Sequence, residues 1–252
     1  MAILSRPSTP CSLDGRVQFT LTTNACSTGL HGDDNWGVVL ERKDGPISLT
    51  DADVQRARRH LMRRDPKLGA LIKRVGKCSI TATSTREPFF ALLSAILSQQ
   101  LSSKAADTIR GRVVTLAGGL ERLTPARLLE LDPAALRAAG VSYPKISYMR
   151  DLAERIIDGR LDLRALETAP DTEVIASITA VKGLGVWSAE MFLMFRLNRP
   201  DVFPVGDLGI VKGVQQHFGM KRRPKPRTMI RLAENWRPYR TVAAWYLWRL
   251  FD

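Results

Sequence analysis

The sequence predicts an all-α fold, and three observations support this prediction. Apolar residues recur with the period of amphipathic helices from about Leu49 to the C-terminus. Capping residues stand directly before prolines at Thr124 and Asp132, the arrangement typical of a helix start. Gly140 and Gly159 follow periodic segments, at the positions where helices end. Roughly ten short helices are therefore expected.

Several of these helices can be placed in order along the chain. Thr50 offers a side-chain oxygen to the free amides that open the first helix. An apolar stripe over residues 89–97 predicts a buried helix. Asp171 or Thr172 is expected to cap a helix that leads into a glycine-rich turn. Residues 239–250 are apolar and aromatic enough to form a core helix.

Residues 1–46 differ from the rest of the chain. They are rich in Ser, Thr, Gly and Asp, and they carry a net charge of −1, which leaves +14 for the remainder. This composition predicts a poorly ordered N-terminal extension, with a small β-hairpin from residues 17–22 and 36–40 as the alternative. A single domain is expected from residue 47 to residue 252.

The charge of the whole chain narrows the choice of partners. A formal charge of +13 and a pI near 10.2 favour a polyanion, with nucleic acid first and an anionic membrane second. No apolar run is long enough to span a membrane, so a cytoplasmic location is expected. Cys11, Cys26 and Cys78 are scattered, which predicts neither a disulfide framework, nor a structural metal, nor a metal cofactor.

A tight turn is predicted at residues 183–185, between two helical segments. Gly183 and Gly185 bracket one apolar residue, Leu184, which is expected to pack between the paired helices. The turn leaves backbone amides free at a helix start, where a phosphate can bind. Such contacts hold DNA without reading its sequence. An ordinary helical hairpin with no ligand is the alternative.

Asp207 stands eighteen residues after Ala189, at the start of another expected helix. The simplest interpretation is an N-cap, which satisfies free amides and does nothing else. A carboxylate held close to DNA also suits a reaction in which positive charge develops. Loss of a base from deoxyribose passes through an oxocarbenium-like sugar, which such a carboxylate can stabilise.

Together these residues resemble the helix-hairpin-helix family of DNA glycosylases, and within it the alkylbase (3-methyladenine) branch. The likeness covers roughly Leu49 to Phe251 and includes residues 90–102, the hairpin, the Asp207 segment and residues 236–239. The resemblance implies a fold of two helical lobes with the active site between them. It also implies a hydrolase that flips alkylated purines, of the 3-methyladenine and 7-methylguanine type, out of double-stranded DNA for base excision repair.

Departures from related branches sharpen this expectation. In relatives that also cut the DNA strand, a lysine two residues after the second hairpin glycine attacks the sugar. Here that position is Trp187, so hydrolysis without strand cleavage, leaving an abasic site, is expected. Iron–sulfur relatives need four cysteines near the C-terminus, and this chain has none there. No cofactor is therefore expected.

Family resemblance assigns the walls of the base pocket to Trp187 and Trp245. An indole face attracts the positively charged ring of an N-alkylated purine. A purely structural role in the core is the alternative for both tryptophans. It is an equally good interpretation for Trp245, which lies in an apolar helix, whereas the pocket is favoured for Trp187, which is adjacent to the hairpin.

The resemblance also predicts how the gap left by the flipped base is filled. The wedge is expected from Gln99, Gln100 or Leu101, of which the last two are favoured. This turn precedes a helix that begins near Ser103, also expected to lie at the DNA, and Lys145 can meet a phosphate. A polar loop between helices is the alternative.

Further expectations concern ligands and competing functions. A monovalent cation is expected at the hairpin, from Lys182 to Gly185, only when DNA is bound. The protein is expected to act as a monomer. One rival is a glycosylase for oxidised, deaminated or mismatched bases. The other is a non-catalytic DNA-binding protein that uses only the hairpin.

Overall fold

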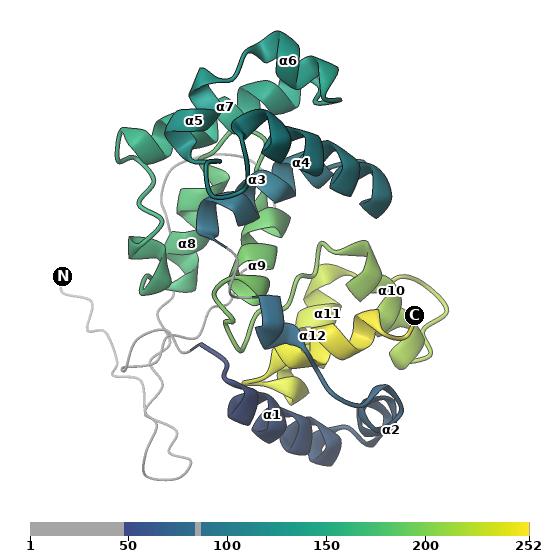
Figure 1. Cartoon of the computed structure of the whole chain (residues 1–252). Helices are drawn as coiled ribbons and strands as arrows, with labels where there is room; N and C mark the ends of the chain where they lie inside the picture. The colour runs from purple at the N-terminus through teal and green to yellow at the C-terminus, as the bar shows by residue number, and fades with distance from the viewer. Residues whose placement is uncertain (1–47, 84–86, 252) are drawn as a thin grey trace, which may run out of the picture.

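A computed structural model describes residues 48–83 and 87–251, and this part of the chain is helical throughout, without strands (Figure 1). The predicted all-α class is confirmed. Twelve α-helices and three short 3-10 helices are present in the described ranges. They are α1 (Asp51–Arg64), α2 (Pro66–Val75), η1 (Ile80–Thr83), α3 (Pro88–Ser98), α4 (Ser103–Ala117), α5 (Pro125–Glu130), α6 (Pro133–Ala138), α7 (Tyr143–Ile157), η2 (Ala165–Glu167), α8 (Asp171–Thr179), α9 (Val186–Phe195), α10 (Leu208–His217), α11 (Pro226–Ala233), η3 (Glu234–Trp236) and α12 (Arg240–Trp248).

Most of the predicted helix starts are confirmed, and one is wrong. Thr50 and Asp53 form a capping box on α1, while the side chains of Thr124 and Asp132 cap α5 and α6. The predicted cap of α8 by Asp171 or Thr172 is wrong, because Pro170 occupies the cap position and Asp171 is already helical. The Asp171 carboxylate instead lies 3.4 Å from the guanidinium of Arg199.

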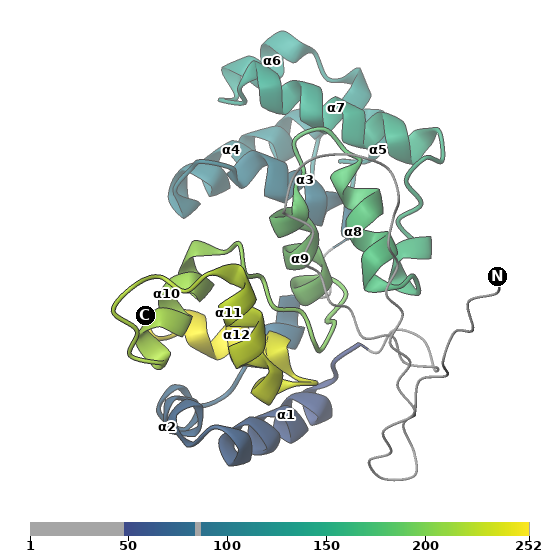
Figure 2. The ribbon, with the colours of Figure 1, turned by 180° about the vertical axis from the view of Figure 1, so that it is seen from behind.

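The helices form two lobes, as the family resemblance implies. One lobe contains α3 to α8, and the other contains α1, α2 and α10 to α12 (Figures 1 and 2). The N-terminal and C-terminal parts of the described chain thus meet in one lobe, where α12 packs against α1, α2 and α10. Helix α9 lies between the lobes and contacts α3 and α8 on one side.

Polar contacts fix the segment that connects α9 to α10. The Asp201 carboxylate accepts hydrogen bonds from Arg240 at 2.8 Å and from Arg237 at 2.5 Å. The Thr241 hydroxyl donates to the Arg199 carbonyl at 2.6 Å and accepts from the Val202 amide at 2.9 Å. These contacts hold the segment against the start of α12, so the beginning of α10 has a defined position relative to α12.

Asp65, in the turn between α1 and α2, connects this turn to the end of α10 and to η3. Its carboxylate accepts from the Leu68 amide at 2.9 Å, from His217 Nε2 at 2.8 Å and from Trp236 Nε1 at 2.9 Å. Burial raises the pKa of Asp65, but the hydrogen bonds outweigh it and lower the pKa to about 2.

The proposed N-terminal extension, residues 1–46, lies outside the described residues, as do Cys11 and Cys26. Cys78 is buried. None of the helices that the structure describes is long and apolar enough to cross a membrane.

Candidate active site

Asp207 caps α10 and is also bound by two tryptophans. Its Oδ1 atom accepts from the Ile210 amide at 2.8 Å and from Trp248 Nε1 at 2.9 Å. Its Oδ2 atom accepts from Trp187 Nε1 at 2.8 Å. The N-cap interpretation is therefore confirmed, but an ordinary cap needs only the amide. The two indole N–H groups come from α9 and α12, so three elements fix the orientation of this one carboxylate.

Two glycines in α10 allow α12 to come close enough for this contact. A Cβ atom on Gly209 would lie 2.8 Å from Cδ1 of Trp248, a distance that real structures do not tolerate. A Cβ atom on Gly213 would lie 3.1 Å from Cβ of Leu247. Helices α10 and α12 accordingly pack with side chains of α12 directly on the backbone of α10.

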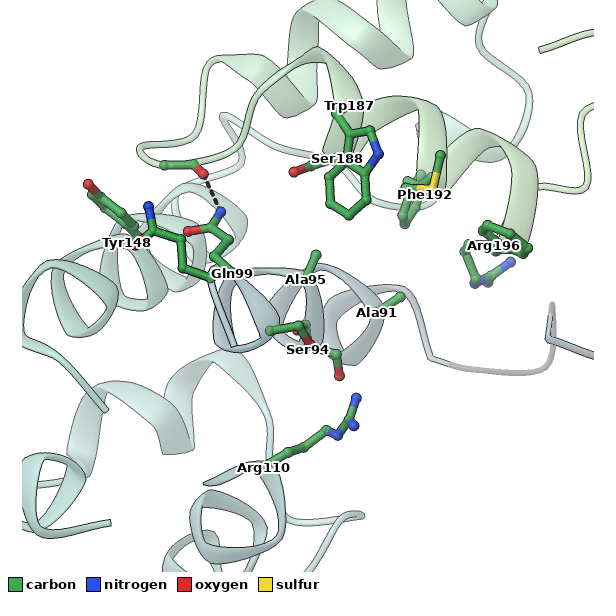
Figure 3. A pocket seen from close by; sticks show the side chains of 15 residues that line it. Ala91, Ser94, Ala95, Gln99, Arg110, Tyr148, Trp187, Ser188, Phe192 and Arg196 are labelled. Carbon is green, nitrogen blue, oxygen red and sulfur yellow. Dashed lines mark hydrogen bonds between the residues drawn. The ribbon is translucent and has the colours of Figure 1, made fainter. Parts of the chain in front are cut away.

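A cleft of about 660 Å³ opens beside Trp187, between α3 and α9 (Figure 3). Helix α3 contributes small side chains, including Ala91 and Ala95, whereas α9 contributes larger ones. The α9 residues that line the cleft are Trp187, Ser188, Met191, Phe192 and Phe195. Trp187 is 45% exposed and is thus available to a ligand. Phe195 stacks on Trp248 with ring centroids 5.8 Å apart, which connects the cleft to the Asp207 site.

The structure brings Trp187 to Asp207 but does not bring Trp245 there. Trp245 is 5% exposed, with its ring 4.1 Å from the Arg249 guanidinium carbon and edge-on to Tyr246. The α12 tryptophan that binds Asp207 is Trp248, which was not among the predicted pocket residues. Because α12 is apolar on nearly all sides, its sequence does not indicate which tryptophan faces the site.

A second carboxyl group, which no sequence pattern predicts, lies near Asp207. Glu190 stands one turn after Trp187 on α9. Burial and, to a smaller extent, the negative charge of Asp207 raise the pKa of Glu190 to about 7. No sequence motif marks this residue, since its raised pKa depends on burial in the folded chain and on the nearby Asp207.

The hairpin between α8 and α9 has the predicted form. Gly183 adopts a left-handed φ of +77°, and a Cβ atom there would collide with the ring of Tyr148. Leu184 is buried, as expected. Gly185 is the N-cap of α9 and offers no side chain to the first amides of the helix. In the described part of the chain, the amides of Gly183, Gly185 and Val186 have no hydrogen-bond acceptor, so they are available to a phosphate.

The predicted wedge turn joins α3 to α4 next to this hairpin. Gln99 is already engaged, because its Nε2 atom donates to the Gly183 carbonyl at 2.6 Å (Figure 3). Gln100 has a left-handed φ of 57° and is exposed, while Leu101 is 38% exposed. Ser103 is the first residue of α4 and is also exposed. Of the three candidates for the wedge, Gln100 and Leu101 are thus the ones free to project.

Lys145 does not present a free ammonium group. Its Nζ atom donates to the Leu97 carbonyl at 2.8 Å and to the Gln99 carbonyl at 2.7 Å. Burial lowers the pKa of Lys145. The predicted phosphate contact therefore competes with a structural one.

Comparisons with known proteins identify the family of the chain. Residues 93–238 match the HhH-GPD superfamily base excision DNA repair proteins. The chain is 34% identical over 213 residues to DNA-3-methyladenine glycosylase 1 of Schizosaccharomyces pombe, and the match covers 84% of this chain and 91% of that protein. It is 31% identical over 202 residues to the alkylbase DNA glycosidase-like protein mag2 of the same yeast, covering 79% and 95%.

Two solved structures are similar to the chain in sequence and in overall fold. DNA-3-methyladenine glycosidase from Bacillus halodurans is 41% identical with a TM-score of 0.69, covering 77% of this chain and 88% of that one. The 3-methyladenine DNA glycosylase of S. pombe, solved in complex with abasic DNA, is 34% identical with a TM-score of 0.70, covering 77% and 95%. The chain therefore belongs to the HhH-GPD superfamily of base excision DNA repair proteins.

Proposed function

We propose that this protein is a monofunctional DNA glycosylase that hydrolyses the N-glycosidic bond of alkylated purines in double-stranded DNA and leaves an abasic site. The observation that carries the proposal is the Asp207 carboxylate, bound by the indole N–H groups of Trp187 and Trp248 beside an open cleft. The relatives named 3-methyladenine glycosylases support the substrate class.

Asp207 is suited to both demands of the reaction. When the C1′–N bond breaks, its electron pair leaves with the base and the sugar becomes oxocarbenium-like. A carboxylate at this point stabilises the positive charge and orients the water that attacks C1′. Oδ2 accepts only the Trp187 bond within the described residues, so it keeps a lone pair for that water.

The exposed indole of Trp187 suits a cationic base. N-Alkylated purines such as 3-methyladenine carry a positive ring, which the electron-rich face of tryptophan attracts. A positively charged base is also a good leaving group, so the enzyme need not protonate it strongly. We assign the second tryptophan of the site to Trp248, in place of the predicted Trp245.

The reaction stops at the abasic site, because no amine occupies the position from which related enzymes attack the sugar. That position is Trp187, whose indole N–H is already bonded to Asp207. The nearby Lys182 projects toward Asp151, with Nζ 4.0 Å from its carboxylate. Schiff-base formation and strand cleavage are therefore not expected.

DNA contacts can be assigned from the same geometry. The free amides of Gly183 and Gly185 bind a backbone phosphate, and Gln100 or Leu101 fills the gap left by the flipped nucleotide. The monovalent cation at the hairpin, the absence of a cofactor, the monomeric state and the cytoplasmic location stay predictions.

Base release from methylated duplex DNA tests the proposal. The wild-type protein should release free methylpurine, and strand breaks should form only after treatment with alkali. Breaks before alkali would indicate a strand-cleaving enzyme. DNA binding without release would favour a non-catalytic protein or a different lesion.

A further inference from the structure

One face of α7 contacts both segments that the proposed function places on DNA. Lys145, Tyr148 and Asp151 stand at three-residue spacing, so each is a surface neighbour of the next. Lys145 contacts the end of α3, while the Tyr148 ring lies against Gly183. Asp151 accepts the Lys182 amide at 2.9 Å. The wedge turn and the phosphate-binding hairpin thus share one rigid support.

The contacts of Lys145 are those of a helix cap. The carbonyl groups at the end of a helix lack internal partners and carry partial negative charge. Lys145 supplies two hydrogen bonds at this end of α3, of 2.8 Å to Leu97 and 2.7 Å to Gln99. Its pKa is lowered by burial, in keeping with an ammonium group withdrawn from solvent.

The contact with Gln99 also constrains the next residue of the turn. Gln100 adopts a left-handed φ of 57°, a conformation that persists in a non-glycine residue only when its surroundings hold it. The Gln99 carbonyl belongs to the peptide that joins Gln99 to Gln100, and Lys145 fixes its direction. On the other side, the side-chain amide of Gln99 is bonded to Gly183. The turn is therefore anchored from α7 and from the hairpin, and only Gln100 and Leu101 project.

We propose that Lys145 is a positioning residue for base flipping, which fixes the wedge turn relative to the hairpin instead of binding a phosphate. This inference rests on the proposed function and adds a specific requirement. Without the lysine, the turn should insert poorly into duplex DNA, while the chemistry at Asp207 is largely retained.

The test compares one lesion in two contexts. A methylated oligonucleotide is offered to Lys145→Met as a duplex and as a single strand, in which no opposite base has to be separated. Single-turnover release should fall about tenfold on the duplex and less than about twofold on the single strand. The matched control is Lys104→Met, which removes an exposed lysine from α4 close to the same turn. If each lysine only attracts DNA through its positive charge, both variants should lose the same share of activity. This result would contradict the proposal.

A second variant, together with the melting temperature of each variant, completes the experiment. Gln99→Leu removes the other anchor and should produce the same duplex-specific loss, with less than additive effects in the double variant. Equal losses of Lys145→Met on duplex and single strand, or a lowered melting temperature alone, would overturn the positioning role.

A binding assay distinguishes failure of the positioning role of Lys145 from failure of the proposed glycosylase function. If the wild type releases no base, binding to an abasic duplex with 2-aminopurine opposite the abasic site still reports insertion of the turn. The fluorescence increase on binding should be reduced in Lys145→Met and retained in Lys104→Met. An unchanged increase in Lys145→Met would contradict the proposal.

Discussion

At the scale of single residues, the hydrogen bonds to Asp207 determine what the site can do. A carboxylate that only capped α10 would need the Ile210 amide alone, yet Trp187 and Trp248 also donate to it. These donors come from two other helices, so the carboxylate is fixed before any substrate binds. Such preorganisation is an effective way to stabilise charge that develops during a reaction.

Removing one indole N–H should lower the rate of base release. Trp187→Phe and Trp248→Phe keep an aromatic ring but lose the donor, and a hydrogen bond to a charged group contributes about 1.5–3 kcal/mol. We expect each variant to lower kcat by about 10- to 100-fold with little change in DNA binding. Single-turnover kinetics and binding to abasic DNA measure both. A larger loss of kcat in Trp245→Phe than in Trp248→Phe would indicate that Trp245, and not Trp248, is the second tryptophan of the site.

Glu190 predicts a particular pH dependence of stability. Its pKa is raised from 4.5 to about 7 by burial and by Asp207, so the folded state holds its proton more tightly than the unfolded state. Glu190 therefore has no destabilising effect below about pH 4.5, and its penalty grows as the pH rises to about 7.

Glu190→Gln should remove this penalty. The free energy of unfolding of the variant should match that of the wild type near pH 4.5 and exceed it by about 1–3 kcal/mol above pH 7. Urea unfolding across this range measures the difference. A constant difference at all pH values would contradict the raised pKa.

Some of these site residues could be predicted from the sequence, and others could not. The cap position of Asp207 could be predicted because it is a local property, whereas its catalytic role was predicted from a spacing to the hairpin that resembles the glycosylase family and stays a prediction. Trp248 and Glu190 could not, because the hydrogen bond of Trp248 depends on the packing of α12 against α10, and the raised pKa of Glu190 depends on burial and on Asp207. When a helix is apolar on all sides, its periodicity does not show which side faces the active site.

At the scale of elements, the approach of α12 to α10 decides whether Trp248 can reach the carboxylate. Gly209 leaves the space in which the Trp248 ring lies, and Gly213 receives Leu247. The sequence shows the two glycines but cannot show that they face another helix. By contrast, the caps at Thr50, Thr124 and Asp132 depend on neighbours a few residues away and could be predicted.

Gly209→Ala should displace Trp248 from Asp207. The added methyl group meets the indole ring at 2.8 Å and Oδ1 of Asp207 at 3.0 Å, so the contact between these two side chains must shift. We expect lower base release together with a loss of about 1–3 kcal/mol in stability, which is typical of overpacking. Gly111→Ala is the matched control, since a Cβ atom there meets nothing within 4 Å and the residue lies within α4. Full activity together with wild-type stability in Gly209→Ala would contradict this displacement.

The same scale explains why the sequence alone does not reveal the partners of Lys145. The sequence after Ser142 predicts a short turn in which Lys145 meets a phosphate, and this predicted turn is wrong, because Lys145 lies in the first turn of α7. The carbonyl groups that it binds lie 46 and 48 residues away in sequence, and only the packing of α7 against α3 brings them close.

At the scale of the whole molecule, two lobes surround the site, and each has its own polar ties. In the lobe that carries Asp207, hydrogen bonds of Asp65 connect the α1–α2 turn to His217 on α10 and to Trp236. Amphipathic periodicity and the resemblance were enough to predict helices in two lobes. The partners of Asp65 lie 152 and 171 residues away, so this tie could not be predicted from sequence.

Asp65 should make the protein sensitive to acid. Its pKa is lowered from 3.8 to about 2 in the folded state, so its stabilising effect is complete above about pH 4 and is lost as the pH falls through about 2. Asp65→Asn should reduce the free energy of unfolding by about 2 kcal/mol at pH 7 and by much less near pH 2. Chemical denaturation at both pH values tests this, and an equal loss at both would contradict it.

The most direct test of the central claim compares wild type with Asp207→Asn on methylated duplex DNA. Asparagine keeps the size of the side chain and an acceptor for the Ile210 amide, but it has no negative charge to stabilise the sugar. We expect methylpurine release to fall by at least about 100-fold while binding to abasic DNA stays within about twofold. Release at the wild-type rate would contradict the account and would reduce Asp207 to a helix cap.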